Sequence, residues 1–551
     1  MTRTLFAPSR ALVGIALLFA GGATAQTSGY RTPPAPIPQI LGTPPAPLVS
    51  LSPDRSTMAF LAREGMPSIA QLAEPELRLA GVRINPQTNG PSRSSFLNGI
   101  AFAPVTGGAQ RPVQLPQAAQ ISFTQWSPSG SHLAFVNTTT KGLELWVVDA
   151  RTTQARRLVG PELNGTLGSP FDWMPDGASL LVRRIVPGRA AAPATPRVPS
   201  GPVIQESTGR GAPVRTFQDL LTNPHDEQLF DYYFTAQLAR VPLTGGTPTP
   251  IGEPGIFTNV SAAPNGQYIR VDRIKRPYSY LAPLTSFASE INILDLRGRR
   301  VHQVANRPDV VMFPIGRDMT NPGPRGISWR ADAPATLVWV EAQDSGNAQR
   351  QTTQRDRVLM LDAPFTGRPR TLIDLDQRFG GVTWGRNDVA LVNSQWSTTS
   401  RTRTYVVNPS QPAAQPRVLW DRSSEDRYGN PGFPITTSNA AGFRVLQFTP
   451  DGQGIFLSGE GASPRGNYPF LDRMNLGTGK TERLWRNEDP HYEALVALVD
   501  ANGQRILTRR ESLTEAPNYY LRDLNRGTAA ALTNFPDPAP QLAGIQRQII
   551  T

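Results

Sequence analysis

The side chains of this chain that are able to do acid–base or metal chemistry are few and lie far apart in the sequence. No two of its four histidines have the spacing of a metal site. The absence of cysteine excludes thiol catalysis and thiolate metal ligands. We expect surface or structural roles for the histidines, and the sequence predicts neither a metal nor a cofactor. The four are His132, His225, His302 and His491.

No serine nucleophile with a recognisable setting occurs either. The chain has no G-x-S-x-G motif, and the nearest string, Gly461–Arg465, lacks the second glycine. A phosphate-binding loop at Gly477–Thr481 is excluded because Met474 stands where that motif needs glycine, and a hairpin turn explains the string. The acids of the later loops are expected to be solvated charges, and we predict no catalytic residue. These acids are Glu425, Asp426 and Glu460.

The elements that would position any site come from a repeated phrase. Its common form has an apolar residue, a Ser, Asp or Thr and an aromatic, then a turn built on Pro-Asp-Gly or a related string, then a hydrophobic strand. This pattern predicts a β-hairpin, and an array of such hairpins is typical of a β-propeller. Seven copies occur, at Val49–Ala62, Ser122–Val136, Phe171–Arg184, Val260–Arg273, Ile327–Glu341, Val382–Asn393 and Leu446–Glu460.

A second pattern supplies the other half of each blade. It has a strand that ends in an Asp or Asn, a tight turn and a further strand. Together the two patterns predict an all-β fold, a β-propeller over residues 48–545 with about seven four-stranded blades and eight possible. The second pattern occurs at Gly142–Leu158, Glu290–Gln303, Arg357–Leu372, Thr404–Leu419, Phe470–Leu484 and Tyr519–Leu532.

Two segments depart from this rhythm. Residues 26–47 are rich in proline, and we expect them to be extended. Residues 187–238 are predicted to be an insertion, with a proline- and glycine-rich loop followed by short helices. We expect Thr216 to cap a first helix with Asp219 at its third position, and Asp226 to start a second turn. Loops that interrupt a rigid scaffold are a plausible place for function.

The N-terminus has the pattern of a secretory signal. Arg3 and Arg10 precede the apolar run Ala11–Ala20, which is too short to span a bilayer, and Ala23–Ala25 supplies small residues for cleavage. Met1 to Ala25 therefore predicts export, to a periplasmic or extracellular location. The net charge of +12 is carried by scattered arginines, so we expect no nucleic-acid partner and no membrane span.

Several longer strings point to a family. The sequence resembles the N-terminal propeller of the prolyl oligopeptidase family of serine peptidases, in the branch of the glutamyl endopeptidases. The resemblance covers essentially the whole chain after the signal. The strings that carry it are Leu72–Arg93, Pro202–Leu221, Lys275–Pro283, Asp421–Pro431 and Glu511–Leu524.

This resemblance implies an α/β-hydrolase domain with a Ser-Asp-His triad beyond Thr551, with residues 546–551 as the start of the linker to it. The chain itself is then expected to be inactive and to gate the access of peptide substrates. We predict that Arg276, Tyr278 and Tyr280 contact peptide, since Arg pairs with carboxylates and Tyr combines apolar contact with a hydroxyl. The alternative for the two tyrosines is that they fill a seam between blades.

Three hypotheses for function remain at this point. The first is the noncatalytic propeller of an exported peptidase, with its hydrolase domain in cis or from a split gene. The second is a standalone exported propeller that binds peptides or an envelope protein, and the third is an enzyme that uses the central channel. The first predicts a large apolar patch on the face that meets the hydrolase, whereas the second predicts a polar face. The loop acids and arginines fit either a substrate face or an ion network (Arg422, Glu425, Asp426 and Arg427).

Overall fold

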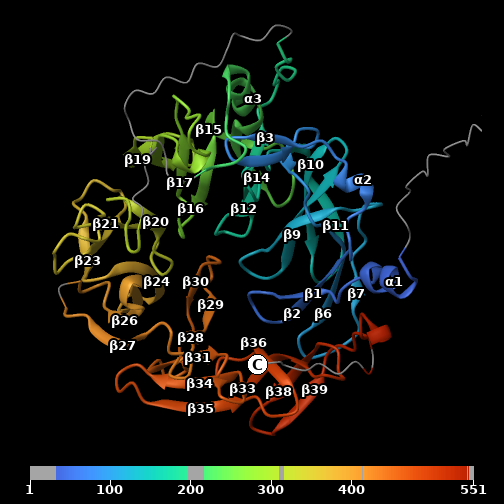
Figure 1. Cartoon of the computed structure of the whole chain (residues 1–551), viewed down its shortest axis with the longest axis vertical. Helices are drawn as coiled ribbons and strands as arrows, with labels where there is room; N and C mark the ends of the chain where they lie inside the picture. The colour runs from blue at the N-terminus through green and yellow to red at the C-terminus, as the bar shows by residue number, and fades with distance from the viewer. Residues whose placement is uncertain (1–32, 197–215, 310–315, 413, 543, 545–551) are drawn as a thin grey trace, which may run out of the picture.

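The computed structural model describes residues 33–196, 216–309, 316–412, 414–542 and 544. The predicted signal peptide, the first part of the proline-rich segment, the middle of the 187–238 insertion and the predicted linker at 546–551 lie outside these residues. The described chain forms a ring of antiparallel sheets around a central axis (Figure 1).

Eight four-stranded units make up this ring in the described residues, and we number them as blades in chain order. Single residue pairs, Leu97–Ile121 and Leu163–Arg184, link the sheets of blades 1 to 3. The first four blades are β1 (Leu48–Leu51), β2 (Thr57–Arg63), β6 (Leu97–Pro104) and β7 (Arg111–Pro112); β8 (Ile121–Trp126), β9 (His132–Thr139), β10 (Gly142–Asp149) and β11 (Ala155–Leu163); β12 (Phe171–Trp173), β13 (Ser179–Ile185), β14 (Ala236–Pro242) and β15 (Thr249–Gly255); and β16 (Phe257–Ala262), β17 (Tyr268–Ile274), β18 (Ser289–Asp295) and β19 (Arg300–Arg307).

The second half of the ring follows the same order. Blades 5 to 8 are β20 (Arg325–Trp329), β21 (Thr336–Ala342), β22 (Asp356–Asp362) and β23 (Arg370–Leu375); β24 (Arg378–Arg386), β25 (Val389–Trp396), β26 (Arg401–Val407) and β27 (Arg417–Ser423); β28 (Phe433–Pro434), β31 (Gly454–Gly459), β34 (Phe470–Asn475) and β35 (Thr481–Arg486); and β36 (Tyr492–Leu498), β37 (Arg505–Glu511), β38 (Asn518–Asp523) and β39 (Thr528–Ala531).

The remaining elements lie in the connections between these strands, except α1, which precedes β1, and η3, which follows β39. They are α1 (Pro36–Gly42), α2 (Ile69–Leu72), β3 (Leu77–Leu79), β4 (Val82–Asn85), β5 (Gly90–Pro91), α3 (Pro224–Phe234), η1 (Leu284–Ser286), η2 (Ser397–Thr399), β29 (Thr436–Ser438), β30 (Arg444–Leu446), β32 (Ala462–Ser463), β33 (Gly466–Asn467) and η3 (Pro540–Leu542).

The repeated phrase forms the hairpin between the first two strands in blades 1 to 6, as predicted, and in blade 7 it closes onto β31 through a single bridge between Phe448 and Ile455. In blade 3 the carboxylate of Asp176 accepts hydrogen bonds from the amides of Ala178 and Ser179, at 2.9 and 3.2 Å. Gly177 takes the positive φ of +63° that closes the turn, a conformation that costs a residue with a Cβ about 1 kcal/mol or more. Local sequence therefore specifies these turns.

Side-chain packing closes the ring. Because neighbouring residues of a strand point to opposite faces, Met58 and Phe60 of β2 pack toward blade 8, whereas Ala59 and Leu61 pack toward blade 2. One buried apolar cluster lies at each of the eight junctions between blades. Blades 1 and 8 exchange no strand, since residues 48–112 form the first and 492–531 the last.

The all-β propeller with a short helical insertion is confirmed, and the described residues form eight blades, the upper of the two predicted counts. All six predicted second hairpins are present. The eighth hairpin, between β36 and β37, has the turn Asp500-Ala501-Asn502-Gly503, without the proline and the preceding aromatic that most of the other copies have. That departure from the phrase is why the pattern found only seven.

Two local predictions were wrong. The proline-rich segment contains helix α1 instead of being wholly extended, because proline fits the first helical turn, where no amide donor is needed. The expected helix from Thr216 does not form, since Asp219 has a φ of +59°, outside the helical region. Instead Asn223 caps α3 through a 3.0 Å bond from the amide of Asp226, with Pro224 in its first turn.

Candidate functional site

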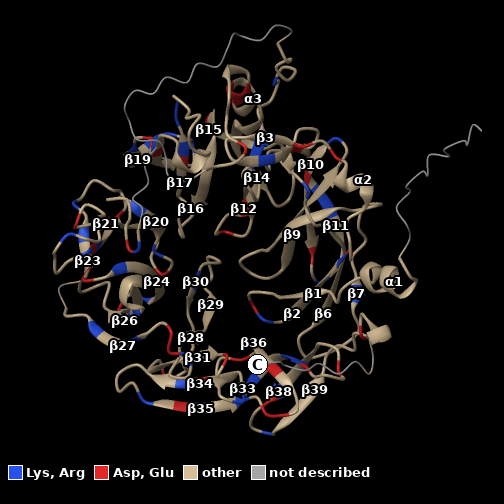
Figure 2. Ribbon diagram, in the orientation of Figure 1, with Lys and Arg blue, Asp and Glu red and all other residues tan. Residues whose placement is uncertain are grey.

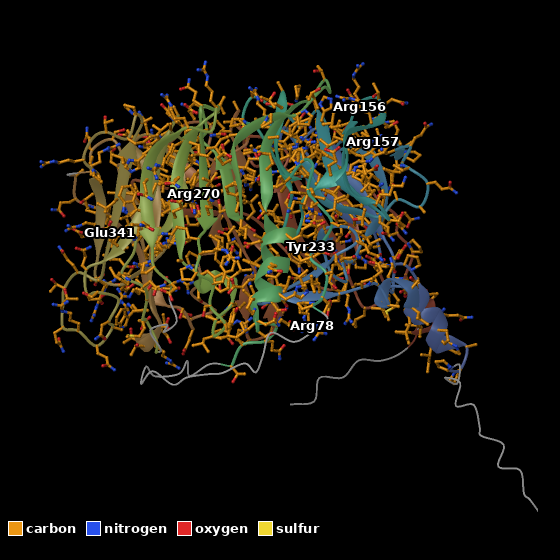
Figure 3. The ribbon with its side chains drawn as sticks, turned by 90° about the horizontal axis from the view of Figure 1, so that it is seen from above. Arg78, Arg156, Arg157, Tyr233, Arg270 and Glu341 are labelled. Atoms are coloured by element: carbon orange, nitrogen blue, oxygen red, sulfur yellow. The ribbon has the colours of Figure 1, made fainter. Side chains whose placement is uncertain are left out.

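The two edges of the ring carry different kinds of connection. Antiparallel strands place the turns between the first and second and the third and fourth strands at one edge, which we call the turn face. The long loops between second and third strands, and the links between blades, lie at the other edge, which we call the loop face. Figure 3 shows the ring from the side, with Arg156 and Arg157 at the turn face and Arg78 at the loop face.

The described part of each of the five strings that carry the family resemblance includes residues of the loop face, although Glu511–Leu524 continues along β38 to the turn face. They come from the long loops of blades 1, 3, 4 and 8 and from the link between blades 6 and 7, although residues 202–215 lie outside the described chain. The idiosyncratic sequence of this chain is therefore gathered on one side of the propeller.

Exposed apolar side chains are gathered on the same face. Of fifteen exposed large apolar side chains in the described residues, eleven lie on its loops, on helices α1 and α2, or at strand ends that border it. Leu513 is 90% exposed, Ile69 is 86% exposed and Phe433 is 70% exposed. This concentration makes the loop face the candidate surface for a contact with another protein domain. The other eight are Ile37, Leu41, Leu48, Met66, Leu72, Leu281, Tyr428 and Tyr492.

Three segments far apart in the sequence pack together on the loop face. Hairpin β3–β4 of the blade 1 loop reaches helix α3 and the blade 4 loop, residues 275–288. The amide of Leu284 donates to the carbonyl of Ala80 at 2.9 Å, and Arg83 donates to Asp219 at 2.6 Å. Phe230 and Phe234 of α3 fill the centre of this platform.

The predicted contact residues Arg276, Tyr278 and Tyr280 lie within this platform. Arg276 pairs with two carboxylates of α3, Glu227 at 2.6 Å and Asp231. Tyr278 donates its hydroxyl to Asp231 and stacks on Phe287 at 5.5 Å. They hold α3 against blade 4, and their contact with peptide stays a prediction.

The environment of these groups shifts their protonation. Hydrogen bonds from its guanidinium to Asp231 and Glu227 raise the pKa of Arg276, and burial followed by the bond to Asp231 raises the pKa of Tyr278. Burial and Glu227 raise the pKa of Tyr280 to about 12. All three groups therefore keep their protons at neutral pH, and none is suited to act as a base.

A cavity of about 510 Å³ opens beside the platform, at the loop-face end of blade 4 and next to residues 166–168 of the link before blade 3. The blade 4 loop lines it through Leu284, Thr285 and Phe287, which are not the residues of that loop predicted from the sequence. Its ionisable lining groups are Asp272 and Arg307, from the loop-face ends of β17 and β19. Sequence reasoning missed both, because each reads as an ordinary polar residue at a strand end.

A second cavity, of about 240 Å³, lies on the ring axis near the turn face. Hairpin β29–β30 of blade 7 reaches across the axis to it: Asn439 donates to the carbonyl of Ala331 in blade 5 at 2.9 Å. At its tip, a Cβ on Gly442 would lie 3.1 Å from Pro128 of blade 2. The hairpin therefore narrows the channel at this end.

Asp172 of β12 lines this axial cavity, and burial raises its pKa to about 6, against an attraction from Arg183 that lowers it. In the folded protein the pKa of Asp172 lies above its ordinary value of 3.8. Protonated Asp172 therefore contributes up to about 3 kcal/mol to the free energy of unfolding below pH 3.8, and this contribution is lost as the pH rises through 6.

We expect Asp172→Asn to raise the thermal midpoint at pH 8 and to change it little at pH 4. Thermal unfolding at both pH values, with Asp388→Asn on the surface as control, measures this; equal effects at both would contradict it.

The histidines and the charged loop residues discussed in the sequence analysis do not come together in one site. His132 contacts Ser131 at 2.9 Å and His491 lies 3.3 Å from Glu515, while no group of three or more His, Asp or Glu side chains in the described residues is arranged to hold a metal. Arg422 donates to the carbonyls of Ser423 and Asp426, each at 3.0 Å, as part of a local loop network (Glu425 accepts from Ser400, and Arg427 lies 3.9 Å from Glu460).

Lys and Arg are spread around the ring, with acidic residues among them (Figure 2). Among the described residues, no helix is both long and apolar enough to cross a bilayer.

Comparison with curated proteins finds clear homologues. The chain is 39% identical to a probable chloroplastic glutamyl endopeptidase of Oryza sativa subsp. japonica, over 95% of this chain and 58% of that protein. It is 38% identical to a probable chloroplastic glutamyl endopeptidase of Arabidopsis thaliana, over 95% of this chain and 57% of that protein. The chain thus spans less than three fifths of the length of these relatives. No family model matches the sequence.

Solved structures similar to this chain include several peptidases. One is an acylaminoacyl peptidase in complex with Z-Gly-Gly-Phe-chloromethyl ketone, 10% identical with a TM-score of 0.37, matched over 90% of this chain and 52% of that chain. Another is the β-propeller domain of the Trilobed protease from Pyrococcus furiosus, 10% identical with a TM-score of 0.36, over 76% of this chain and 99% of that domain.

Proposed function

We propose that this chain is the propeller of a serine peptidase of the glutamyl endopeptidase kind, and that its loop face docks an α/β-hydrolase domain and limits which peptides reach it. The observation that carries the proposal is the concentration of exposed apolar side chains on the loop face. A propeller that works alone would be expected to cover that face with polar groups.

The homologues support the same reading. Their similarity extends over nearly the whole chain, and more than two fifths of each relative has no counterpart in these 551 residues. The catalytic Ser, Asp and His are then supplied by that further part of the protein, in cis or as a partner polypeptide. The activity, the peptide substrates and this arrangement are all part of the proposal.

Location completes the proposal. Residues 1–25 have the pattern of a cleaved secretory signal, so the peptidase would work in the periplasm or outside the cell. Absence of cysteine is compatible with this, since the extensive core of eight packed blades needs no disulfide for stability.

Labelling with a fluorophosphonate probe tests the division of labour. The recombinant 551-residue chain should show no label after denaturing electrophoresis, because it contributes no activated serine. The same propeller purified from its native cells should bring with it a labelled serine hydrolase that carries G-x-S-x-G, on the same polypeptide or bound to it. A labelled recombinant chain, or a native preparation with no labelled hydrolase, would overturn the proposal.

A further inference from the structure

The axial cavity has one ionisable group in its described lining, the carboxylate of Asp172. Its walls are the first strands of blades 2, 3 and 4, and the tip of hairpin β29–β30 covers it from the side of blade 7. Strand β12 and this hairpin both reach toward the ring axis (Figure 1). The neighbours of Asp172 on β12, Phe171 and Trp173, pack into the core between blades 2 and 3, so Asp172 faces the side of blade 4.

The carboxylate of Asp172 forms no ion pair among the described residues. Arg183 attracts it, but the guanidinium of Arg183 donates to three backbone carbonyls instead (Leu167, Ser169 and Phe257). Burial raises the pKa of Asp172 more than the attraction of Arg183 and the amide of Gln125 lower it. A partly desolvated carboxylate without a direct partner is stabilised by any cation that comes into contact with it.

The other walls of the cavity suit the alkyl stem of an amine. Trp126 donates its indole N–H to Oγ of Ser50, and Trp173 donates its own to the carbonyl of Gln125, both at 3.1 Å. Because these two donors are engaged, the indoles offer a ligand apolar surface and electron-rich rings, which attract cations. Further apolar surface comes from Phe443 of the hairpin and from three prolines of the turns of blades 1 to 3 (Pro53, Pro128 and Pro175).

We propose that the axial cavity binds an alkylammonium group, with Asp172 as the residue that pairs with it. The volume of about 240 Å³ is below the roughly 300 to 1,000 Å³ of drug-sized sites, so the cavity suits one side chain or one chain end. The inference rests on the proposed function for the source of this group, a peptide in the channel. The ammonium is then a Lys side chain or the peptide's amino terminus.

Binding of short peptides to the recombinant 551-residue chain, by isothermal titration calorimetry at pH 7, tests the inference without any catalytic domain. Three peptides of one sequence are compared: a blocked peptide with a central Lys, its norleucine twin with both ends blocked, and the norleucine twin with a free amino terminus. Norleucine keeps the stem of Lys and removes the amine, so the first and third peptides separate the two sources of ammonium. At pH 7 Asp172 is mostly ionised and both amines are mostly protonated.

We expect one of the two amine peptides to bind at least roughly tenfold tighter than the fully blocked norleucine twin, the value of one charged hydrogen-bonded pair. Equal affinity of all three peptides, or no measurable binding of any of them, would overturn the inference. Either result leaves the proposed function to be tested by the labelling experiment above, because no step of this titration depends on a hydrolase.

A charge-removing variant and a surface variant provide the matched comparison. Asp172→Asn should weaken the amine peptide roughly tenfold to a hundredfold and leave the neutral twin unchanged, because only the charge of the site is lost. Asp388→Asn, at a half-exposed carboxylate in a turn of blade 6, should change neither affinity. A preference for the amine that survives in Asp172→Asn, or an equal loss in Asp388→Asn, would contradict the role of Asp172.

An uncharged variant shows whether the peptide binds in the cavity itself. Ala441 lies at the tip of hairpin β29–β30 and lines the cavity. Ala441→Leu adds volume there and leaves Asp172 in place, so it should weaken the amine peptide at least roughly tenfold, since a ligand that no longer fits loses its charged contact. An unchanged affinity in this variant would place the binding elsewhere and overturn the inference.

Discussion

Methionine in place of Arg378 is expected to lower the free energy of unfolding by about 3 to 5 kcal/mol, because it removes the bidentate partner of one buried carboxylate and one of the cationic partners of a second. Arg378 donates to both oxygens of Asp344, at 2.9 and 2.7 Å, and to Asp356 at 3.0 Å. Both aspartates are 0% exposed. Their network joins the loop of blade 5 to the first strand of blade 6, so its loss should weaken that junction of the ring.

The remaining partners of these carboxylates set the size of the effect. Burial alone would raise the pKa of Asp344, but hydrogen bonds from Arg378 and then Arg355 hold it below its ordinary value. Arg355 is a single donor at 3.0 Å, which cannot replace the bidentate pair.

Chemical denaturation of Arg378→Met, compared with Arg473→Met, measures the difference. Arg473 forms an ion pair with Glu482 in which both side chains are about half exposed, and such pairs are worth about 0 to 1 kcal/mol. If the two variants lose the same stability, the buried network is not what holds blades 5 and 6 together.

Features with a local signal could be predicted from the sequence. The turn phrase with Pro-Asp-Gly specifies its hairpin within a few residues, as in blade 3. Dependence on a local signal also explains the two features that the sequence did not predict correctly. The eighth hairpin was missed because Asp500–Gly503 forms it with a different turn. The helix from Thr216 was wrong because Asp219 adopts a left-handed backbone, with its carboxylate bonded to Arg83, 136 residues earlier. A tertiary contact acts at Asp219, whereas Asp500 stabilises its turn locally by accepting hydrogen bonds from the amides of Gln504 and Arg505.

The candidate sites depend almost wholly on such distant contacts. The loop of Arg276 was identified as polar and aromatic, yet its partner Glu227 lies 49 residues away on a helix whose packing cannot be read from sequence. Asp272 and Arg307 come together only because β17 and β19 end at the same edge of one blade. Residue type and spacing along the chain carry no sign of this.

Side chains on the loop face should be shielded from solvent reagents when the hydrolase is present. The chain has no cysteine, so single cysteines report on individual positions without background. Leu281 and Leu513 are 50% and 90% exposed on the loop face, and cysteine at either should react freely with maleimide in the isolated chain. An interface that buries them should slow the reaction at least roughly tenfold. The cysteine then reacts only when the interface opens, and each 1.4 kcal/mol of opening free energy lowers the rate by a factor of ten.

Asn502 provides the matched control on the opposite edge. It is exposed in the turn of blade 8, the same blade as Leu513, so cysteine there should react equally in every form of the protein. This comparison removes any general effect of size or preparation on the labelling rate.

The measurement that tests the central claim most directly is the maleimide labelling rate of Leu281→Cys, Leu513→Cys and Asn502→Cys, in the isolated 551-residue chain and in the protein expressed and purified from its native cells. We predict protection of Cys at the two leucine positions in the native protein, with the Asn502 position unchanged. Equal rates at all three positions in both preparations would contradict docking of a catalytic domain on the loop face.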